Sequence, residues 1–335
     1  MIEKKLTFLK HLYGTCDSNI VINELIHAGL PYYPVFSFQF AFRFVPRQDG
    51  ILDDTIEPKL DEMPDDFAKA GAYQVYGIRP LSIERDGDKG AFFDKIKKNL
   101  ETSSYMPCML DGYYDEATTY AGKYRKVHGF HGRIITGLDE NYVYYQATHP
   151  SDPGGEFQLS REEFWTACGA SIGFEYPAIG KSREEIHSVI NQALQNWFCT
   201  VNYEKMFEDM MLFSEAIRMC PDLSIYIEPK LVPNRLPKSR LFRNLNGMCL
   251  SRGAAVSFFQ GYLDDFKISA YQVPLEHLRQ SLNLWTRVKM LLVKYGMKET
   301  TRFQTSMADY LLQICEHEQE AVALLKQAIS EEMNH

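Results

Sequence analysis

A cysteine placed at a loop-to-helix junction is the first residue of this chain that could carry chemistry. Cys16 follows a Gly-Thr pair in "HLYGTCDSNIVINELIHAGL" and precedes apolar residues whose spacing predicts a helix over 16–29. With Thr15 as N-cap, the first-turn N–H groups would favour the thiolate and could bind an oxyanion. Asp17 opposes that thiolate, and a buried structural thiol is the alternative interpretation.

A nucleophilic cysteine needs a base, and "KVHGFHGRIITG" supplies two histidines. His131 opens a predicted strand and is the favoured base, while His128 lies in the loop before it and is the second choice. A histidine at a strand entrance beside a helix N-terminus is the arrangement of papain-like folds. Polar loop histidines are the alternative. No further ligand occurs at metal-binding spacing, so no metal is expected.

The elements that would position these residues form an α+β pattern. Phe36, Phe38, Phe40, Phe42 and Phe44 alternate with other residues, which predicts a strand packed on the core of a sheet. The remaining elements expected in the first half are a helix over 90–103, a strand over 105–114, a hairpin of strands 133–136 and 142–146, and a helix over 159–170 opened by a Ser160–Glu163 capping box.

The sequence of the second half of the chain predicts only helices and no strands. Amphipathic patterns cover residues 183–198, 203–220, 275–296 and 307–333. Because the first half is helix first and sheet later, without alternating β and α units, an antiparallel sheet is expected there. We therefore predict two domains: a papain-like catalytic domain over 1–178 and an all-α helical domain over 179–335.

Composition narrows the function classes. The net charge of −8 argues against general binding of nucleic acid, which requires surplus Lys and Arg. Seven scattered cysteines without a CxxC pair indicate free thiols in a reducing compartment. No segment is long and apolar enough to cross a bilayer, and the start of the chain has no secretory pattern. A cytoplasmic protein without membrane contact is expected.

These residues and their order carry a family resemblance. Cys16 at a helix start, then "HGRIITGLDENYVYY", then "LSREEFW" resemble papain-like enzymes of the bacteriocin-leader peptidase group. Within that group, "CMLDGYYDE", the His-x-x-His segment and the attached helical domain resemble the butirosin biosynthesis protein H family. The amide-forming enzyme of closthioamide assembly is a related case. By pattern, the resemblance covers most of residues 10–175.

The resemblance implies an acyltransferase of secondary-metabolite or antibiotic biosynthesis. In such an enzyme, the cysteine takes an acyl group from an acyl carrier protein and passes it to a small-molecule amine, forming an amide bond. Cys16 and His131 correspond to the family's nucleophile and base. No cofactor would be bound, because the phosphopantetheine arrives on the carrier protein.

The chain departs from the papain pattern at two positions. Lys10 stands where relatives often have a glutamine oxyanion donor. The third catalytic member falls near "QATHP", where Gln146 is the nearest side chain able to orient an imidazole and Asp152 is its rival.

The segment around Asp111 is the expected binding site of the amine. Asp111 ends a predicted strand, where a carboxylate would attract a cationic acceptor, and Tyr114 and His128 complete the expected site. A strand-end turn carboxylate is the alternative for Asp111.

A basic segment is the candidate docking site for the carrier protein. No acid occurs between Glu228 and Asp264, whereas the segment contains Lys230, Arg235, Lys238, Arg240, Arg243 and Arg252. Such a local positive field could hold an acidic protein or a phosphate. A solvated face is the alternative.

Two other function classes remain open at this stage. A cysteine peptidase or amidase would use the same residues but release the acyl group to water. A papain-like domain without catalysis would act as an interaction module, an alternative that Gln146 in place of the usual aspartate mildly favours. The acyl group, the amine and the oligomeric state are not predicted.

Overall fold

The chain folds into two compact units, which we call the sheet unit and the helical unit. The sheet unit comprises Met1–Val35 and Ala72–Lys181, and the helical unit comprises Phe36–Gly71 and Ser182–His335. The computed structural model describes residues 2–3, 9, 11, 16–27, 29–36, 40–46, 56–57, 75–76, 79–83, 87–102, 106–121, 124–148, 154–175, 182–223, 240–298 and 301–332.

One antiparallel sheet of seven strands forms the frame of the sheet unit. The strand order is β4-β9-β5-β6-β7-β8, and β1 pairs with β6. The strands are β1 (Ile2–Glu3), β4 (Arg79–Ile83), β5 (Met106–Asp111), β6 (Phe130–Leu138), β7 (Tyr142–Ala147), β8 (Glu156–Ser160) and β9 (Cys168–Glu175). The predicted α+β class and antiparallel sheet are confirmed, and β4, β8 and β9 are strands that the sequence analysis did not identify.

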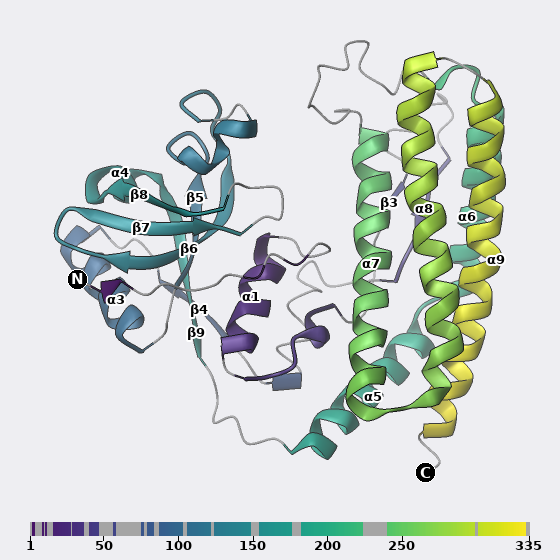
Figure 1. Cartoon of the computed structure of the whole chain (residues 1–335), viewed down its shortest axis with the longest axis horizontal. Helices are drawn as coiled ribbons and strands as arrows, with labels where there is room; N and C mark the ends of the chain where they lie inside the picture. Colours follow the sequence, from purple (N-terminus) through teal and green to yellow (C-terminus); the bar gives the residue numbers. More distant parts are fainter. Residues whose placement is uncertain are drawn as a thin grey trace. The chain divides into compact units, whose positions relative to one another are not determined.

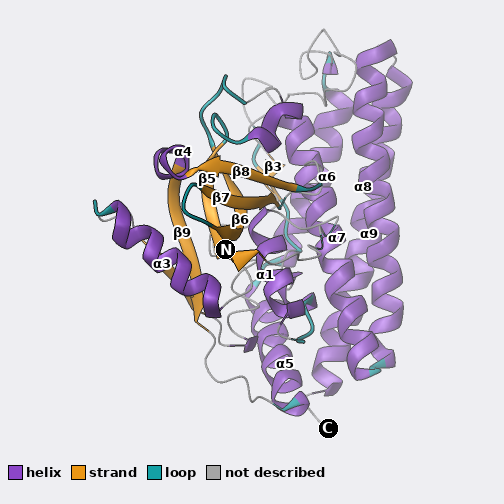
Figure 2. Cartoon of the chain, turned by 60° about the vertical axis from the view of Figure 1, so that its left-hand side comes forward, coloured by secondary structure: helices purple, strands orange, loops and turns teal. Residues whose placement is uncertain are grey.

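Helices lie on both sides of this sheet. Figures 1 and 2 show α1 and α3 on opposite sides of it, and both helices contact β6. The main core lies on the α3 side, where α3 and α4 pack on β5, β6 and β7 through Phe92, Ile96, Leu110, Ile135 and Phe164. The helical elements of this unit are α1 (Cys16–His27), the 3-10 turns η1 (Tyr33–Phe36) and η2 (Glu116–Ala121), α3 (Lys89–Thr102) and α4 (Arg161–Ala167).

Strand register determines which face of the sheet each side chain occupies. Leu110 of β5 pairs with His131 of β6, and Ile134 pairs with Gln146 of β7. Since alternate residues of a strand point to opposite faces, His131 shares the α3 face with Arg133 and Ile135. Ile134 and Gln146 belong to the opposite face.

The helical unit is a bundle of long amphipathic helices. Its helices are α5 (Arg183–Thr200), α6 (Tyr203–Met219), α7 (Arg240–Phe266), α8 (Gln272–Lys298) and α9 (Thr301–Glu332), and Figure 1 shows α6, α7, α8 and α9 running alongside one another. Four of them match predicted helices, whereas α7 was not predicted. Among the described helices, none is both long enough and apolar enough to cross a membrane.

The phenylalanine-rich segment belongs to the helical unit, which corrects the prediction of a strand on the sheet core. Phe40, Phe42 and Phe44 are buried as the two-residue period predicts, although Ala41 between them is buried as well. However, Phe42 packs on Phe213 of α6 and Trp285 of α8. Regular strand structure covers only β2 (Arg43–Phe44), which pairs with β3 (Ile56–Glu57). Phe38 lies outside the described residues.

A buried ion pair anchors this segment to the bundle. The guanidinium of Arg252 in α7 binds both carboxylate oxygens of Glu318 in α9, at 2.9 and 2.7 Å, and also donates to the carbonyl of Ala41. Ser281 and Trp285 of α8 donate to the same carboxylate, at 2.6 and 3.0 Å. Arg252 is fully buried, so its predicted contribution to a positive surface field is wrong.

Candidate active site

Helix α1 begins at Cys16, as the sequence predicted. Its C-terminal end is closed by Gly29, which has a positive φ of 71°, and the N–H of Leu30 donates to the carbonyl of Leu25 at 2.8 Å. This is the glycine-dependent Schellman arrangement that ends many helices. Val21, Ile22 and Leu25 are buried and hold the helix on the unit. The side chain of Cys16 lies outside the described residues.

A chain of hydrogen bonds connects the first turn of α1 to the strand that carries His131. The side-chain amide of Asn19 donates to the carbonyl of Thr148 at 3.1 Å, and the Thr148 hydroxyl donates to the carbonyl of Gly132 at 2.8 Å. Asn19 stands three residues after Cys16, or about 4.5 Å along the helix axis. Gly132 is the residue after His131. The contacts therefore fix the start of α1 near the start of β6.

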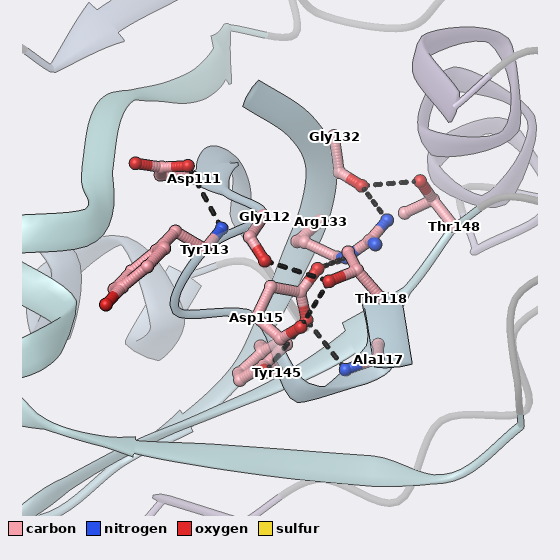
Figure 3. Close-up of polar contacts among 10 residues, drawn as sticks. All are labelled: Asp111, Gly112, Tyr113, Asp115, Ala117, Thr118, Gly132, Arg133, Tyr145 and Thr148. Carbon is pink, nitrogen blue, oxygen red and sulfur yellow. Dashed lines mark hydrogen bonds and ion pairs between the residues drawn. The ribbon is translucent and has the colours of Figure 1, made fainter. Parts of the chain in front are cut away.

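The same chain continues into a buried polar network (Figure 3). Arg133 donates to the Gly132 carbonyl at 2.8 Å and, through Nε, to Asp115 at 2.7 Å. Asp115 also accepts hydrogen bonds from the Tyr145 hydroxyl and the Ala117 N–H, both at 3.0 Å. Burial and the charge of Asp115 raise the pKa of Tyr145, so its hydroxyl stays protonated as the donor. Hydrogen bonds therefore connect α1, the start of β6 and the turn that follows β5.

The imidazole of His131 lies against the backbone of Gly112. A Cβ on Gly112 would stand 3.1 Å from His131 Cδ2 and 3.3 Å from Nε2. The Gly112 N–H donates to the Gly129 carbonyl at 2.7 Å, and its carbonyl accepts from the Thr118 hydroxyl at 2.8 Å. Residue 112 must therefore be small, because a side chain there would displace the half-buried His131 ring.

The second histidine forms a carboxylate–imidazole pair. His128 Nδ1 lies 2.7 Å from Asp111 Oδ2, while Asp111 Oδ1 accepts the N–H groups of Tyr113 at 3.1 Å and Gly129 at 3.0 Å. Partial burial opposes ionisation of Asp111, but the His128 and backbone hydrogen bonds outweigh it and lower the pKa of the carboxyl. An ionised carboxylate can only accept, so Nδ1 carries the proton and Nε2 of a neutral imidazole is the basic atom.

Aromatic side chains hold this imidazole in place. The His128 ring stacks on Tyr113 with centroids 4.6 Å apart and planes 12° from parallel. The Arg125 guanidinium lies over the rings of Tyr113 and Tyr114 and is ion-paired with Glu163. Tyr114, which we expected in the amine site, packs partly against the α3-side core instead. Tyr113 is therefore the tyrosine that contacts the imidazole of the Asp111–His128 pair.

Gln146 does not orient His131. Its pairing with Ile134 places it on the face of the sheet opposite to His131, so the predicted contact between the two side chains is wrong. The rival, Asp152, lies outside the described residues, as does Lys10.

Four of the five cysteines whose side chains are described have raised thiol pKa values, which makes them poor nucleophiles. Hydrogen bonding to Cys168 and burial raise the pKa of Cys108, and burial raises the pKa of Cys220 and Cys249. Burial also raises the pKa of Cys315 to about 11. These thiols remain protonated at neutral pH, which limits the competition for any electrophile that reaches Cys16.

The predicted docking residues are only partly described. Arg243 is exposed on α7, whereas Arg240 is the first residue of α7 and its side chain is not described. Arg235 and Lys238 lie outside the described residues. Within the described ranges, no three His, Cys, Asp or Glu side chains gather in a way that could hold a metal ion.

Sequence reasoning missed the residues that organise this site. Asn19, Asp115, Arg133 and Thr148 were not identified, because each forms contacts far apart in the chain. A local signal existed only for Asp115, since "DEAT" is typical of a capped turn and Asp115 does cap η2 through the N–H of Ala117. No known family model matches the chain, and no curated protein sequence matches it.

Proposed function

We propose that this protein is a papain-like acyltransferase that forms an amide through a thioester on Cys16, with His131 as the base. The observation that carries the proposal is the hydrogen-bonded path Asn19–Thr148–Gly132. It holds the start of α1, at Cys16, close to the start of β6, whose second residue is His131, and a Cys–His dyad requires such proximity.

Two further features support the proposal. The N-terminal end of the α1 dipole, where Cys16 lies, favours both a thiolate and a developing oxyanion. The described competing thiols of Cys108, Cys220, Cys249 and Cys315 all have raised pKa values. The register of β5 and β6 places the His131 side chain on the α3 face, opposite to α1, so the dyad requires its imidazole to pass the start of β6 to reach Cys16.

The reaction would proceed in two steps. The Cys16 thiolate attacks a carrier-protein thioester, the carrier thiolate leaves with the proton that His131 took from Cys16, and an acyl-Cys16 thioester remains. An amine then attacks that carbonyl, the new C–N bond forms, and the C–S bond to Cys16 breaks. In this proposal the exposed Arg243, together with Arg235, Lys238 and Arg240, receives an acidic carrier protein.

Intact-mass measurement with an acyl-cysteamine thioester tests the proposal. We expect one acyl adduct on the wild type, no adduct on Cys16→Ala, and acylation slowed on the order of 10²-fold in His131→Ala. Cys220→Ala is the matched control, because it removes a half-buried thiol distant in sequence, and it should acylate normally. An adduct that persists in Cys16→Ala would refute the mechanism.

The fate of the adduct distinguishes the other two functions. Rapid loss in buffer, unaffected by added amines, would identify a cysteine peptidase or amidase. Failure of Cys16 to react with either the thioester or an alkylating reagent would identify a non-catalytic interaction module.

A further inference from the structure

The pair formed by Asp111 and His128 has the geometry of a general base that is separate from His131. We infer that His128, oriented by Asp111, takes the proton from the incoming amine in the second step of the proposed reaction. This inference rests on the proposed function and adds a catalytic residue, His128, and a positioning residue, Asp111. The sequence analysis instead gave Asp111 the task of binding the amine directly.

The contacts of Asp111 argue against direct binding of the amine. Its two oxygens already accept three hydrogen bonds, from His128 Nδ1 and from the N–H groups of Tyr113 and Gly129. A cationic amine would have to compete with all three. The carboxylate instead fixes the tautomer of His128, since a proton on Nδ1 leaves the lone pair on Nε2.

The exposure of the pair fits proton exchange with solvent. The side chain of His128 is 71 % exposed, whereas that of Asp111 is 13 % exposed. Among the described residues, none forms a hydrogen bond with Nε2 of His128. The imidazole is thus rigid on its carboxylate side and open on the side where a substrate would approach.

The location of the pair relates it to the other catalytic candidates. Asp111 pairs with Phe130, which places it on the sheet face opposite to His131, while Gly112 directly after it contacts the His131 ring. The two histidines are therefore three residues apart in sequence and separated by one glycine backbone. One can serve Cys16 while the other serves a second substrate.

The proton balance is complete without any additional reagent. An alkylammonium ion gives one proton to Nε2 of His128 and becomes a neutral amine, which attacks the acyl-Cys16 carbonyl. When the tetrahedral intermediate collapses, the C–S bond breaks and the amide nitrogen loses its second proton, which neutralises the departing thiolate by way of His131. The proton on His128 passes to solvent because the side chain is exposed.

Single-turnover measurements on pre-acylated enzyme test the inference, because they separate aminolysis from acylation. A primary diamine is added to the acyl-enzyme, and loss of the adduct is followed by mass spectrometry from pH 6 to 9. We expect His128→Ala to acylate within about two-fold of the wild type but to undergo aminolysis on the order of 10²-fold more slowly. Val127→Ala, at an exposed neighbouring position, is the matched control and should behave as wild type in both steps.

The variant Asp111→Asn tests whether Asp111 positions His128 for aminolysis or only stabilises the fold. The charged groups around the imidazole are Asp111 and, across the Tyr113 ring, Arg125 with its partner Glu163. An asparagine amide at this position can donate to Nδ1, which would move the proton of the neutral imidazole to Nε2 and remove the basic atom. We therefore expect Asp111→Asn to slow aminolysis while acylation stays within about two-fold of the wild type.

The outcomes separate this inference from the proposed function. Unchanged aminolysis in His128→Ala, or an Asp111→Asn variant in which acylation and aminolysis slow equally, would overturn the inference alone. If His128→Ala blocked acylation while His131→Ala did not, His128 would be the base of Cys16 and the division of labour would be wrong. A wild type that takes up no acyl group would refute both proposals.

Discussion

Two carboxylates four residues apart, Asp111 and Asp115, each bind a basic side chain, from His128 just before β6 and from Arg133 within β6. Asp115 and its partner Arg133 have side chains 0 % and 1 % exposed, and a tyrosine hydroxyl and a backbone N–H complete the carboxylate's contacts. Asp111 is nearly as well bonded, but its partner His128 is 71 % exposed. The two carboxylates are therefore similarly hydrogen-bonded, but the partner of Asp115 is closed to solvent and the partner of Asp111 is exposed to it.

The difference in exposure between the two pairs follows from the chemistry of their partner side chains, an arginine and a histidine. An arginine keeps its charge at every pH of interest and can be buried permanently when it is fully paired. A histidine gains and loses a proton near neutral pH and needs access to solvent or substrate to do so. The Asp115–Arg133 pair is therefore closed to solvent, whereas His128 of the Asp111–His128 pair can exchange a proton with it.

Removing the charge of Asp115 is the change with the largest expected effect. Asp115→Asn leaves the buried guanidinium of Arg133 without its anion, which should lower the free energy of unfolding of the sheet unit by about 3–5 kcal/mol. Asp111→Asn, the matched control, should lower it by less than about 1 kcal/mol because its partner is exposed. Hydrogen exchange of β5 and β6 amides across a denaturant series measures both changes. Equal losses in the two variants would contradict the contrast between the pairs.

The two glycines beside these pairs provide a test of intermediate size. In Gly112→Ala, the new Cβ would approach the Gly129 carbonyl and His131 Cδ2 to 3.1 Å, so we expect a loss of about 1–3 kcal/mol and slower acylation of Cys16. Gly129→Ala meets no atom within 4 Å and keeps the N–H that binds Asp111. It should change stability by no more than about 0.5 kcal/mol. Unfolding measurements and the acylation assay compare the two, and a harmless Gly112→Ala would show that His131 is free to move.

Local patterns in the sequence were sufficient to predict many of the elements. The helix that starts at Cys16 and stops before Gly29, the Ser160 N-cap and the hairpin of β6 and β7 all follow from local residue types, and all are present. Helix α7 was missed because Gly247, Gly253 and Gly261 lower the helix propensity of its sequence. Its stability comes from packing on α8 and from the buried Arg252, which no local pattern reveals.

Contacts between segments that are distant in the sequence could not be predicted from local patterns. The period of Phe36–Phe44 predicts that one face is buried, but it contains no information on whether a sheet or a helix covers that face. In the site, Asp111 and His128 were both assigned to binding of the amine, but their 2.7 Å contact was not predicted, because it depends on the path of the loop between them. The misplacement of Gln146 has a similar cause, since its face follows from the β6–β7 register.

The smallest expected effect is the pH dependence that Asp111 contributes to stability. Its folded-state pKa is lowered, so its contribution is fully present above the unfolded value of about 3.9 and is lost as the pH falls through the folded pKa. Wild type and Asp111→Asn should therefore differ most near neutral pH and converge below about pH 4. The difference should stay under about 1 kcal/mol, since His128 is exposed to solvent. The opening free energies of β5 amides, measured by hydrogen exchange between pH 3 and 7, give this difference. If the difference between wild type and Asp111→Asn grew as the pH fell, the effect of burial on the pKa of Asp111 would outweigh that of its three hydrogen-bond donors.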